Sequence, residues 1–284
     1  MSNTIDLHIH TIASDGTDDP VQLAESVKAV GINVFAITDH DTITGVEQLK
    51  TQVPEGAIFI PGIEFSCRMP SGKCHILGYG CNTNHPAFQS VLSQGTNLRR
   101  AKLEQRLSFL SKKGIRFPED ELETLYQLSS VGKPHLGNLM VKYGYAPDKK
   151  TAIEETINLC PTGSSRIEAQ IAVKAILASG GIPVWAHPLG GEGEKQVAPE
   201  KFSTMLAELT GFGLMGLECF YSKYPLAYCE KLAKFAQAHS LLISGGSDYH
   251  GANKSVALGT LNADNQPVSA EQLTILNVLL GIIE

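Results

Sequence analysis

Histidines and acidic residues follow most of the short apolar runs in this chain of 284 residues. His8 and His10 alternate along one extended segment, so both side chains point to the same side and can hold one ion. Further candidates end the later runs: Asp39, His40, Glu64, His187, Asp248 and His250. Imidazole and carboxylate ligands together favour manganese, iron or zinc. Any one of these histidines alone would be read as a hydrogen-bonded core or surface residue, but the set predicts a metal cluster.

Apolar runs of strand length alternate with helical patterns, which is typical of parallel βα units. Seven strands are expected, at residues 4–7, 34–37, 57–60, 75–79, 182–186, 214–218 and 241–244. Helices are expected at residues 20–30, 167–179, 199–210, 225–239 and from residue 270. Asp19-Pro20 supplies an N-cap and a first-turn proline, and Gly31 a stop. The pattern predicts an α/β fold, a distorted TIM-like barrel with the metal cluster at its mouth.

The region from about Pro86 to Ser165 interrupts this rhythm. Helical patterns run through residues 89–113, 119–128, 136–143 and 149–158. We therefore expect a barrel formed by residues 1–86 and 166–284, with a helical cap subdomain inserted at residues 87–165. Its position after the fourth strand places the cap over the barrel mouth, where insertions can shape specificity.

Composition restricts the function by exclusion. No apolar stretch approaches the roughly 18 residues of a membrane span, and the first residues lack a signal-peptide pattern. We therefore expect a cytoplasmic protein without membrane contact. The six cysteines contain no C-x-x-C pair, and we expect reduced thiols. The net charge of −6 argues against binding to extended duplex nucleic acid, although bound metal and local cations can still hold phosphate. No P-loop and no Gly-x-Ser-x-Gly motif is present.

Five short motifs in order resemble those of the PHP (polymerase and histidinol phosphatase) family. They are Asp6-Leu7-His8-Ile9-His10, Ile37-Thr38-Asp39-His40-Asp41, Pro61-Gly62-Ile63-Glu64, Ala186-His187-Pro188 and Gly245-Gly246-Ser247-Asp248-Tyr249-His250. The resemblance implies a (β/α)7 barrel with two or three divalent metal ions at the carboxyl ends of the strands. It implies a first site of His8, His10, Glu64 and Asp248, a second of Glu64, His75 and His187, and a third of Asp15, His40 and His250.

The roles of Asp15, Asp39 and Glu64 carry an alternative or a refinement. A histidine often stands at the position of Asp15 in related proteins, and Asp15 also fits a turn residue in Ser14-Asp15-Gly16. Asp39 is expected to orient a ligand rather than to bind metal itself. Glu64 fits a carboxylate that bridges two ions about 3.5 to 4 Å apart, as in two-metal hydrolytic sites.

The segment Ser130-Val131-Gly132-Lys133-Pro134-His135 resembles the Ser-x-Gly-Arg-Pro-His signature of stand-alone PHP phosphoesterases. That subgroup includes nucleoside 3′,5′-bisphosphate phosphatases and 5′-3′ RNA exonucleases. The resemblance implies that Lys133, His135 and Arg100 bind the substrate phosphate. Lys133 replaces an arginine and loses its bidentate geometry. His135 also fits a helix N-terminal residue without a ligand contact, and Arg99 and Arg100 also fit a solvated helix face.

The expected activity is metal-dependent hydrolysis of a phosphate ester, with Asp248 or His187 as the residue that transfers a proton. The favoured substrate is a 3′,5′-bisphosphonucleoside, followed by a short 5′-phosphorylated oligoribonucleotide. Histidinol-phosphate phosphatase is the alternative enzyme, disfavoured because its usual relatives lack this cap motif. A metal-binding PHP module without activity, and a metal-dependent amidohydrolase acting on C–N bonds, are alternatives of other classes.

Overall fold

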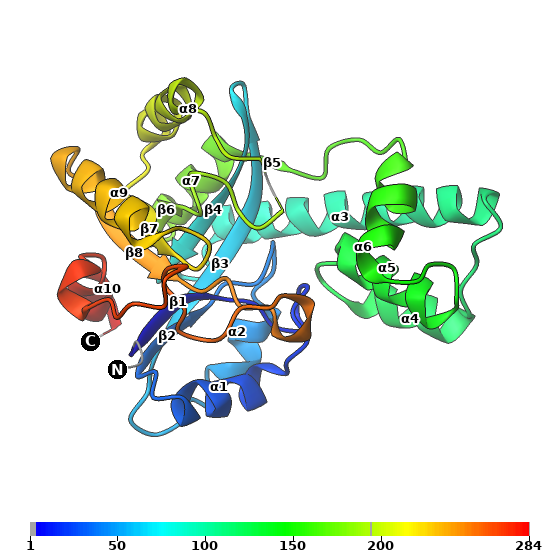
Figure 1. The fold of residues 1–284 in the computed structure, drawn as a ribbon, viewed down its shortest axis with the longest axis horizontal. Coiled ribbons are helices and arrows are strands. Elements are labelled where there is room, and N and C mark those ends of the chain that lie inside the picture. Colours follow the sequence, from blue (N-terminus) through cyan, green and yellow to red (C-terminus); the bar gives the residue numbers. More distant parts are fainter. Residues whose placement is uncertain (1–3, 194, 284) are drawn as a thin grey trace.

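A curved sheet of eight strands forms the centre of the molecule in the computed structural model, which describes residues 4–193 and 195–283. Its order is β1-β2-β3-β4-β6-β7-β8, and β5 pairs with β3. The strands are β1 (Ile5–Ile9), β2 (Val34–Ile37), β3 (Ile58–Met69), β4 (Gly72–Tyr79), β5 (Ile167–Glu168), β6 (Ile182–Trp185), β7 (Gly216–Tyr221) and β8 (Leu242–Gly246). The amide of Asp248, just after β8, donates to the carbonyl of His8 in β1 at 2.8 Å. The sheet is therefore nearly closed, which confirms the predicted distorted barrel (Figure 1).

The prediction of parallel βα units throughout is wrong for one strand. β4 pairs antiparallel with β3 on one side and with β6 on the other. β3 extends over 12 residues, well past the apolar run at 57–60, and Pro70-Ser71-Gly72 then turns the chain directly back into β4. No helix lies between these two strands, because the second half of β3 is itself buried. The hairpin pairs Ser66 with His75 and so brings the His75 side chain beside Glu64 of β3.

The helices that flank the barrel largely follow the predictions. α1 (Pro20–Ala29) begins where expected, because the Asp19 carboxylate accepts hydrogen bonds from two amides of its first turn. α7 (Ala169–Ala178), α8 (Pro199–Phe212) and α9 (Leu226–Ala238) also match within a few residues. α2 (Thr44–Leu49) was not predicted, and it has no side-chain N-cap hydrogen bond.

The prediction of a helix from residue 270 is wrong in its first half. A 3-10 turn at Ala270–Gln272 comes first, and α10 (Leu276–Ile283) begins only later. The intervening residues bind to β8 instead, because Thr274 Oγ1 accepts a hydrogen bond from the Ile243 amide and the Ile275 amide donates to the Ile243 carbonyl. Pairing with the barrel thus takes the place of a continuous helix.

The inserted region consists of helices that leave the barrel on one side (Figure 1). They are α3 (Pro86–Lys112), α4 (Glu119–Gln127), α5 (Lys133–Lys142) and α6 (Lys149–Thr151). The first three predicted helices are confirmed, whereas residues 149–158 form a short α-turn, a π-turn and a 3-10 turn rather than one helix. The start of α3 packs into the barrel core through Phe88 and Val91, and Leu103 and Leu110 near its end join a separate apolar cluster. α3 therefore connects the barrel to the inserted helices.

None of the described helices combines the length and the apolar character that spanning a bilayer requires. The six cysteines are free thiols.

Candidate metal centre and adjoining cavity

The structure brings all nine predicted ligands together at one end of the barrel. His8 lies in β1, Glu64 in β3 and His75 in β4, and the others lie in the loops that follow strands: His10, Asp15, His40, His187, Asp248 and His250. The carboxyl ends of the parallel strands open at this end, which is where barrel enzymes place their active sites. The predicted set thus forms one spatial cluster.

Glu64 lies at the centre of this cluster. Its Oε1 is 3.0 Å from Nδ1 of His75 and 3.2 Å from Nε2 of His187. Its Oε2 is 2.9 Å from Nδ1 of His40 and 3.3 Å from Nε2 of His10. Nε2 of His8 is 3.5 Å from the same Oε2. One buried carboxylate therefore faces five imidazoles from four different segments. This is the position of a group that two cations can share.

His8, His10 and Asp248 form a second group. The Nε2 atoms of the two histidines are 3.1 Å apart, and Oδ1 of Asp248 lies 3.6 Å and 3.4 Å from them. Both histidine side chains are fully buried. Two imidazole nitrogens and a carboxylate oxygen that converge in this way match the ligand arrangement around a single cation.

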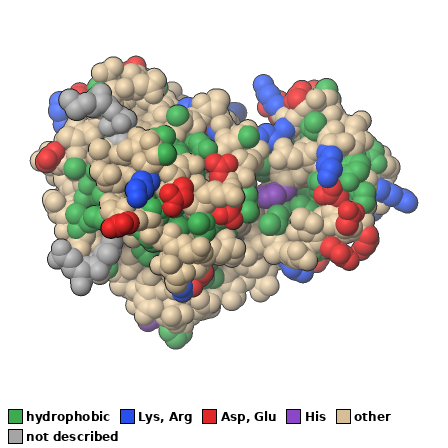
Figure 2. All heavy atoms as spheres, turned by 90° about the horizontal axis from the view of Figure 1, so that it is seen from below, with side chains coloured by type: hydrophobic (Ala, Val, Ile, Leu, Met, Phe, Trp, Pro, Cys, Tyr) green, Lys and Arg blue, Asp and Glu red, His purple; other side chains and the backbone are tan. Residues whose placement is uncertain are grey.

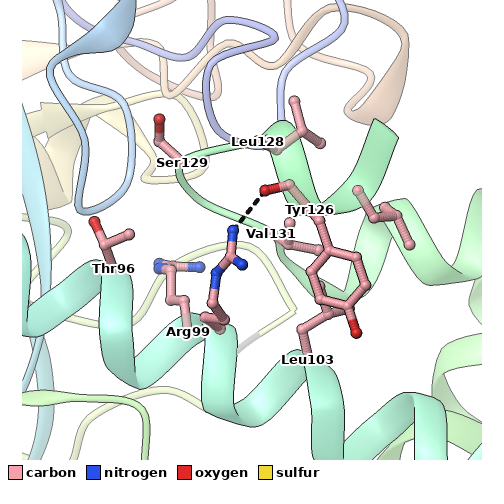
Figure 3. Close-up of a pocket in the computed structure, with 9 residues that line it drawn as sticks. Thr96, Arg99, Leu103, Tyr126, Leu128, Ser129 and Val131 are labelled. Atoms are coloured by element: carbon pink, nitrogen blue, oxygen red, sulfur yellow. Dashed lines mark hydrogen bonds between the residues drawn. The ribbon is translucent and has the colours of Figure 1, made fainter. Parts of the chain in front are cut away.

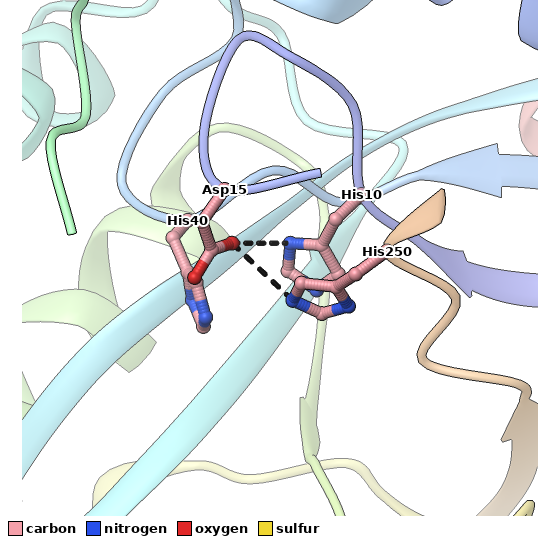
Figure 4. A group of neighbouring side chains, drawn as sticks. All are labelled: His10, Asp15, His40 and His250. Carbon is pink, nitrogen blue, oxygen red and sulfur yellow. Dashed lines mark ion pairs between the residues drawn. The ribbon is translucent and has the colours of Figure 1, made fainter. Parts of the chain in front are cut away.

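A third group consists of His10, Asp15, His40 and His250, whose ligand atoms lie within 4.8 Å of one another (Figure 4). Oδ1 of Asp15 is 3.2 Å from Nε2 of His250 and 3.8 Å from Nδ1 of His10. The structure thus places Asp15 against histidines and not only in a turn. His10 borders two groups, a sharing that the family motifs did not imply.

Buried polar atoms of the cluster test whether it fits a metal. Among the described residues, Asp15 Oδ1, His40 Nδ1 and Glu64 Oε2 are buried without a hydrogen-bond partner. Such atoms are rare in folded proteins, where a water or an ion usually completes them. All three lie close to other atoms of the cluster: Glu64 Oε2 is 2.9 Å from His40 Nδ1, and Asp15 Oδ1 is 3.2 Å from His250 Nε2. The donor set therefore fits divalent cations.

The charge states of the cluster also suit cations. Burial alone would raise the pKa of Glu64, but His40, His75 and His8 hold it well below its usual range. For Asp248 burial is likewise outweighed, mainly by Lys254, so that its pKa is also held well below the usual range. Burial lowers the pKa of His10 well below its usual value and that of His75 to about 4, whereas nearby carboxylates outweigh burial and raise the pKa of His8, His40 and His187. Metal binds anionic carboxylates and neutral imidazoles, so a bound cation would displace a proton from such a histidine.

Glu218 orients two of the histidines and was not predicted as a site residue. Its Oε1 is 2.8 Å from Nδ1 of His8, and its Oε2 accepts a hydrogen bond of 2.7 Å from the backbone amide of His187. The side chain is fully buried. A carboxylate on the far nitrogen fixes the tautomer of a metal-binding histidine. The only sequence signal was an acidic residue inside the apolar run of β7.

Asp39 takes the orienting position expected for it. Its carboxylate accepts a hydrogen bond from Ser14 Oγ at 2.6 Å and two more from Thr11. Ser14 Oγ in turn lies 3.3 Å from Nδ1 of His10. Asp39 thus stiffens the loop that carries His10 and Asp15, and it belongs to none of the three ligand groups.

The backbone at the strand ends is strained where ligands stand. His187 and Asp248 have φ angles of +30° and +58°, a region that residues other than glycine rarely adopt and that clusters at functional sites. At the end of β8, a Cβ on Gly246 would lie 2.3 Å from Cβ of His8. Glycine therefore allows β8 to approach β1 closely enough for Asp248 to reach His8.

Tyr221 and Lys254 hold the other oxygen of Asp248. The Tyr221 hydroxyl donates to Oδ2 at 3.0 Å, and Lys254 Nζ lies 2.5 Å from the same atom. Neither residue was predicted as part of the site. Tyr221 ends the β7 run and could have been noticed, whereas Lys254 stands in a loop with no distinguishing pattern.

The phosphate-binding candidates in the cap lie in different places. Lys133 lines a cavity beside the cluster, and its Nζ donates to Asn158 Oδ1. His135 accepts a hydrogen bond from the Gly132 amide through Nδ1, which is the helix N-terminal role left open by the sequence. Arg100 does not line this cavity, and its guanidinium donates to the Tyr126 carbonyl at 2.6 Å. Arg99 and Tyr126 also line a smaller pocket (Figure 3).

Arg99, the neighbour of Arg100, approaches the site instead. Its Nε lies 2.6 Å from Oδ2 of Asp41, and its Nη2 donates to Ser66 Oγ at 2.9 Å. Successive residues of a helix project about 100° apart. Arg99 lines the cavity beside the cluster and Arg100 does not, and the sequence alone did not say which of the two would.

Two connected cavities open at the cluster. One of about 150 Å³ is lined by ligands of all three groups together with Glu192 and Lys254. A second of about 290 Å³ lies beneath the cap and shares Asp15, His40 and His75 with the first. Histidine is visible in the recess between the barrel and the helical part (Figure 2). The candidate metal centre is thus accessible to a small molecule.

A barrel with a buried imidazole and carboxylate cluster at its strand ends defines the class of metal-dependent barrel hydrolases. The family model of the PHP domain matches residues 6–170, and the chain belongs to that family.

Three relatives match the chain over most of their length. The 5′-3′ exoribonuclease of Haemophilus influenzae is 28% identical over 88% of this chain and 91% of its own. The phosphoribosyl 1,2-cyclic phosphate 1,2-diphosphodiesterase of Eggerthella lenta is 28% identical over 87% and 94%. The 3′,5′-nucleoside bisphosphate phosphatase of Chromobacterium violaceum is 26% identical over 88% of each. All three names describe hydrolysis of phosphate esters, and the prediction of a phosphoesterase is confirmed.

The fold agrees with a solved structure. An amidohydrolase from Chromobacterium violaceum, determined with bound sulfate and no metal, superposes with a TM-score of 0.83 at 23% identity and covers 98% of this chain and 96% of its own. At this level of identity the likeness shows the fold alone. It extends through both the barrel and the cap region.

Proposed function

We propose that this chain is a metal-dependent phosphoesterase that removes a phosphate from a small nucleotide, with a 3′,5′-bisphosphonucleoside as favoured substrate and a short 5′-phosphorylated oligoribonucleotide as the next. The observation that carries the proposal is the convergence of nine candidate ligands, with Glu64 at their centre, beside a cavity. The adjoining cavity is lined by lysines and arginines. The names of the relatives point to the same substrates.

We infer that the cluster holds two or three divalent ions, with manganese, iron and zinc as candidates. His8, His10 and Asp248 would bind one ion, and His75 and His187 would bind a second. Glu64 would be a ligand of both. Asp15, His40 and His250 would bind the third. When bound, such ions polarise a phosphoryl group and lower the pKa of water.

The residues of the chain then position the ester and move protons. The Lys254 ammonium group lies in the same cavity as Asp248 and His187, where it can offset negative charge on a phosphoryl oxygen. Asp248 and His187 are the proposed proton-transfer groups. Both line the cavity, and Oδ2 of Asp248 accepts from Tyr221 and Lys254. Metal binding would limit each of them as a free base.

We also propose residues 87–165 as the cap that covers substrate, and a cytoplasmic location, which the free cysteines support. The complete ligand set speaks against a PHP module without activity. Lys133 is retained as a phosphate-binding candidate because it lines the cavity, whereas Arg99 takes the place first given to Arg100.

The test is hydrolysis by metal-free protein reconstituted separately with manganese, iron and zinc. Free phosphate is measured for adenosine 3′,5′-bisphosphate and histidinol phosphate. Chromatography measures the mononucleotide from a 5′-phosphorylated oligoribonucleotide and the ring-opened monoester from a cyclic phosphodiester. We expect hydrolysis of the bisphosphate that disappears in His8→Ala and persists in His239→Ala, a matched change at an exposed histidine. Faster hydrolysis of histidinol phosphate or of the cyclic diester would overturn the substrate assignment, and no hydrolysis with any metal would overturn the activity.

A further inference from the structure

The loop that carries Asp15 lies between the barrel and the cap. On the barrel side, Oδ1 of Asp15 is 3.2 Å from Nε2 of His250 and 3.8 Å from Nδ1 of His10 (Figure 4). On the cap side, a Cβ added to Gly132, just before α5, would lie 3.6 Å from Oδ2 of Asp15. The Asp15 carboxylate therefore stands where the two parts of the molecule meet.

A chain of two side chains joins the cap to this loop. The ammonium group of Lys149, in α6 of the cap, donates to Oδ1 of Asn253 at 2.8 Å and to the Asn253 carbonyl at 3.1 Å. Asn253 belongs to the barrel, after β8, and its Nδ2 donates to the backbone carbonyl of Asp15 at 2.8 Å. A cap lysine thus reaches the backbone of a candidate metal ligand through one amide side chain.

A second contact from the cap ends on the residue before Asp15. The ring of His135 accepts a hydrogen bond from the Gly132 amide and also hydrogen-bonds to the Ser14 backbone. Burial lowers the pKa of His135, so the ring is neutral near pH 7, with one donor and one acceptor nitrogen. The cap therefore holds the same short loop from α5 and from α6.

Asp15 depends on such support more than the ligands within strands do. His8 and Glu64 lie in β1 and β3, whose hydrogen-bonded ladders fix their backbones, whereas Asp15 stands in a loop. Burial would raise the pKa of Asp15, but His40 and His250 hold it well below its usual range. Oδ1 of this buried anion has no hydrogen-bond partner among the described residues. Keeping an anion in such a place is costly unless a cation completes it, so its position must be held.

We propose that Lys149 and Asn253 are positioning residues for Asp15, so that docking of the cap and cation binding by the third group strengthen each other. The inference rests on the proposed function for the assignment of a cation to that group. Because binding free energies are linked, the coupling is reciprocal: the cap held by Lys149 raises the affinity for the cation, and the bound cation holds the cap. The cap is then fastened over the cavity when the metal centre is fully loaded.

The first test is a manganese titration of the metal-free protein, in which electron paramagnetic resonance of the free ion gives the number and affinity of bound ions. Asp15→Asn identifies the ion that the third group holds. In Lys149→Met and Asn253→Ala we expect this ion to bind about 10- to 100-fold more weakly, as for other residues that orient metal ligands. The remaining ions should bind as in the wild type.

Two further variants separate positioning from a general loss of structure. Lys149→Arg keeps a cationic donor at this place and should retain most of the affinity for that ion. Lys150→Met removes the neighbouring exposed charge and is the matched control, with wild-type binding expected. Circular dichroism establishes that each variant is folded.

The second test measures the coupling in the opposite direction. Hydrogen exchange followed by mass spectrometry compares residues 132–151 of the cap with and without manganese. We expect manganese to slow exchange there in the wild type, and this protection to be lost in Asp15→Asn and in Lys149→Met.

The outcomes separate this inference from the proposed function. Unchanged affinity for that ion in both folded variants, or equal protection of the cap in Lys149→Met and wild type, would overturn the positioning role even in an active phosphoesterase. A wild type without an ion that Asp15→Asn loses would overturn it as well. The expected weakening without hydrolysis of any ester would uphold the positioning role and reject the phosphoesterase.

Discussion

The metal centre and the cavity beneath the cap lie side by side but are built in opposite ways. Six basic side chains of that cavity form a cationic wall: Lys73, Arg99, Lys102, Arg106, Lys133 and Arg166. In the metal centre, Glu64, Asp248 and Asp15 are anionic and buried among imidazoles, with oxygen and nitrogen lone pairs left unpaired. In the wall, buried and half-buried cations face one another, and Arg106 has no carboxylate partner among the described residues. One region is completed by cations and the other by an anion.

This contrast teaches how one cavity can define a substrate. The barrel supplies the reacting centre, because its candidate ligands lie in strands or in the loops that follow them, and Glu218 and Asp39 bind the residues around them. The wall stands mostly on α3 and α5, which belong to the cap region. Changes in the first region should therefore abolish the reaction, and changes in the second should alter only which phosphate ester is preferred.

The largest effect is expected from Glu64→Gln. Glu64 faces five histidines, so loss of its charge removes the shared ligand from more than one ion. We expect a loss of activity of more than about 100-fold, larger than changes to residues behind the ligands usually give, and a lower metal content by mass spectrometry. Glu25→Gln on the exposed face of α1 is the control. Full metal content and activity in Glu64→Gln would show that the carboxylate does not bridge ions.

The next effect is expected from Glu218→Gln, which keeps the shape but not the charge behind His8. We expect metal affinity to fall by about 10- to 100-fold, as for other carboxylates that orient metal-binding histidines. The measurement is a competition titration with a fluorescent chelator. An affinity equal to that of the wild type would mean that Glu218 serves only the fold.

A pH profile of the binding of sulfate, as a probe for a phosphoryl group, is expected to show a smaller effect in the cationic wall. Sulfate does not titrate near neutral pH. Burial and then the neighbouring cations lower the pKa of Lys102 to about 8. Below pH 8 the Lys102 amine is already protonated, so the sulfate affinity in that range does not change with the titration of Lys102. Above pH 8 the free Lys102 is neutral and binding must take up a proton, so affinity should fall until the raised pKa of the complex is passed. The charged groups that face it are Lys73, Arg106, Lys133 and Arg166. A profile that is the same in wild type and Lys102→Met would contradict this assignment.

The smallest effect is expected from Arg100→Ala. Its guanidinium binds the Tyr126 carbonyl and lies over the Tyr126 ring, away from the wall. We expect less than about a twofold change in kcat/KM, within the range of surface substitutions. Arg99→Ala is the comparison, because Arg99 lines the cavity and should cost far more. An Arg100→Ala loss as large as that of Arg99→Ala would restore Arg100 as a phosphate ligand.

The sequence predicted the metal centre far better than the wall, for a physical reason. Parallel strands end at one face of a barrel, so His8, Glu64 and Asp248 could be placed together from strand positions alone. The sequence analysis assigned no role to Glu218 or Lys254, because their roles depend on which atoms meet across the barrel and not on spacing.

The wall depends on how α3 is rotated and where the cap helices lie, which no periodicity specifies. Lys102 and Arg106 both lie on the side of α3 that faces the cavity, but the sequence showed them only as charges on a long helical pattern. The antiparallel turn into β4 was missed for a similar reason, since the second half of β3 pairs with it through side chains that alternate irregularly in polarity.

The most direct test of the account is anomalous diffraction from crystals of the manganese-loaded protein grown with sulfate. The account predicts two or three manganese peaks among His8, Glu64, His75, Asp248 and His250, and a sulfate bound to Arg106 and Lys102 in the adjoining cavity. Manganese absent from the strand ends, or sulfate located only among the barrel ligands and not on the cationic wall, would contradict it.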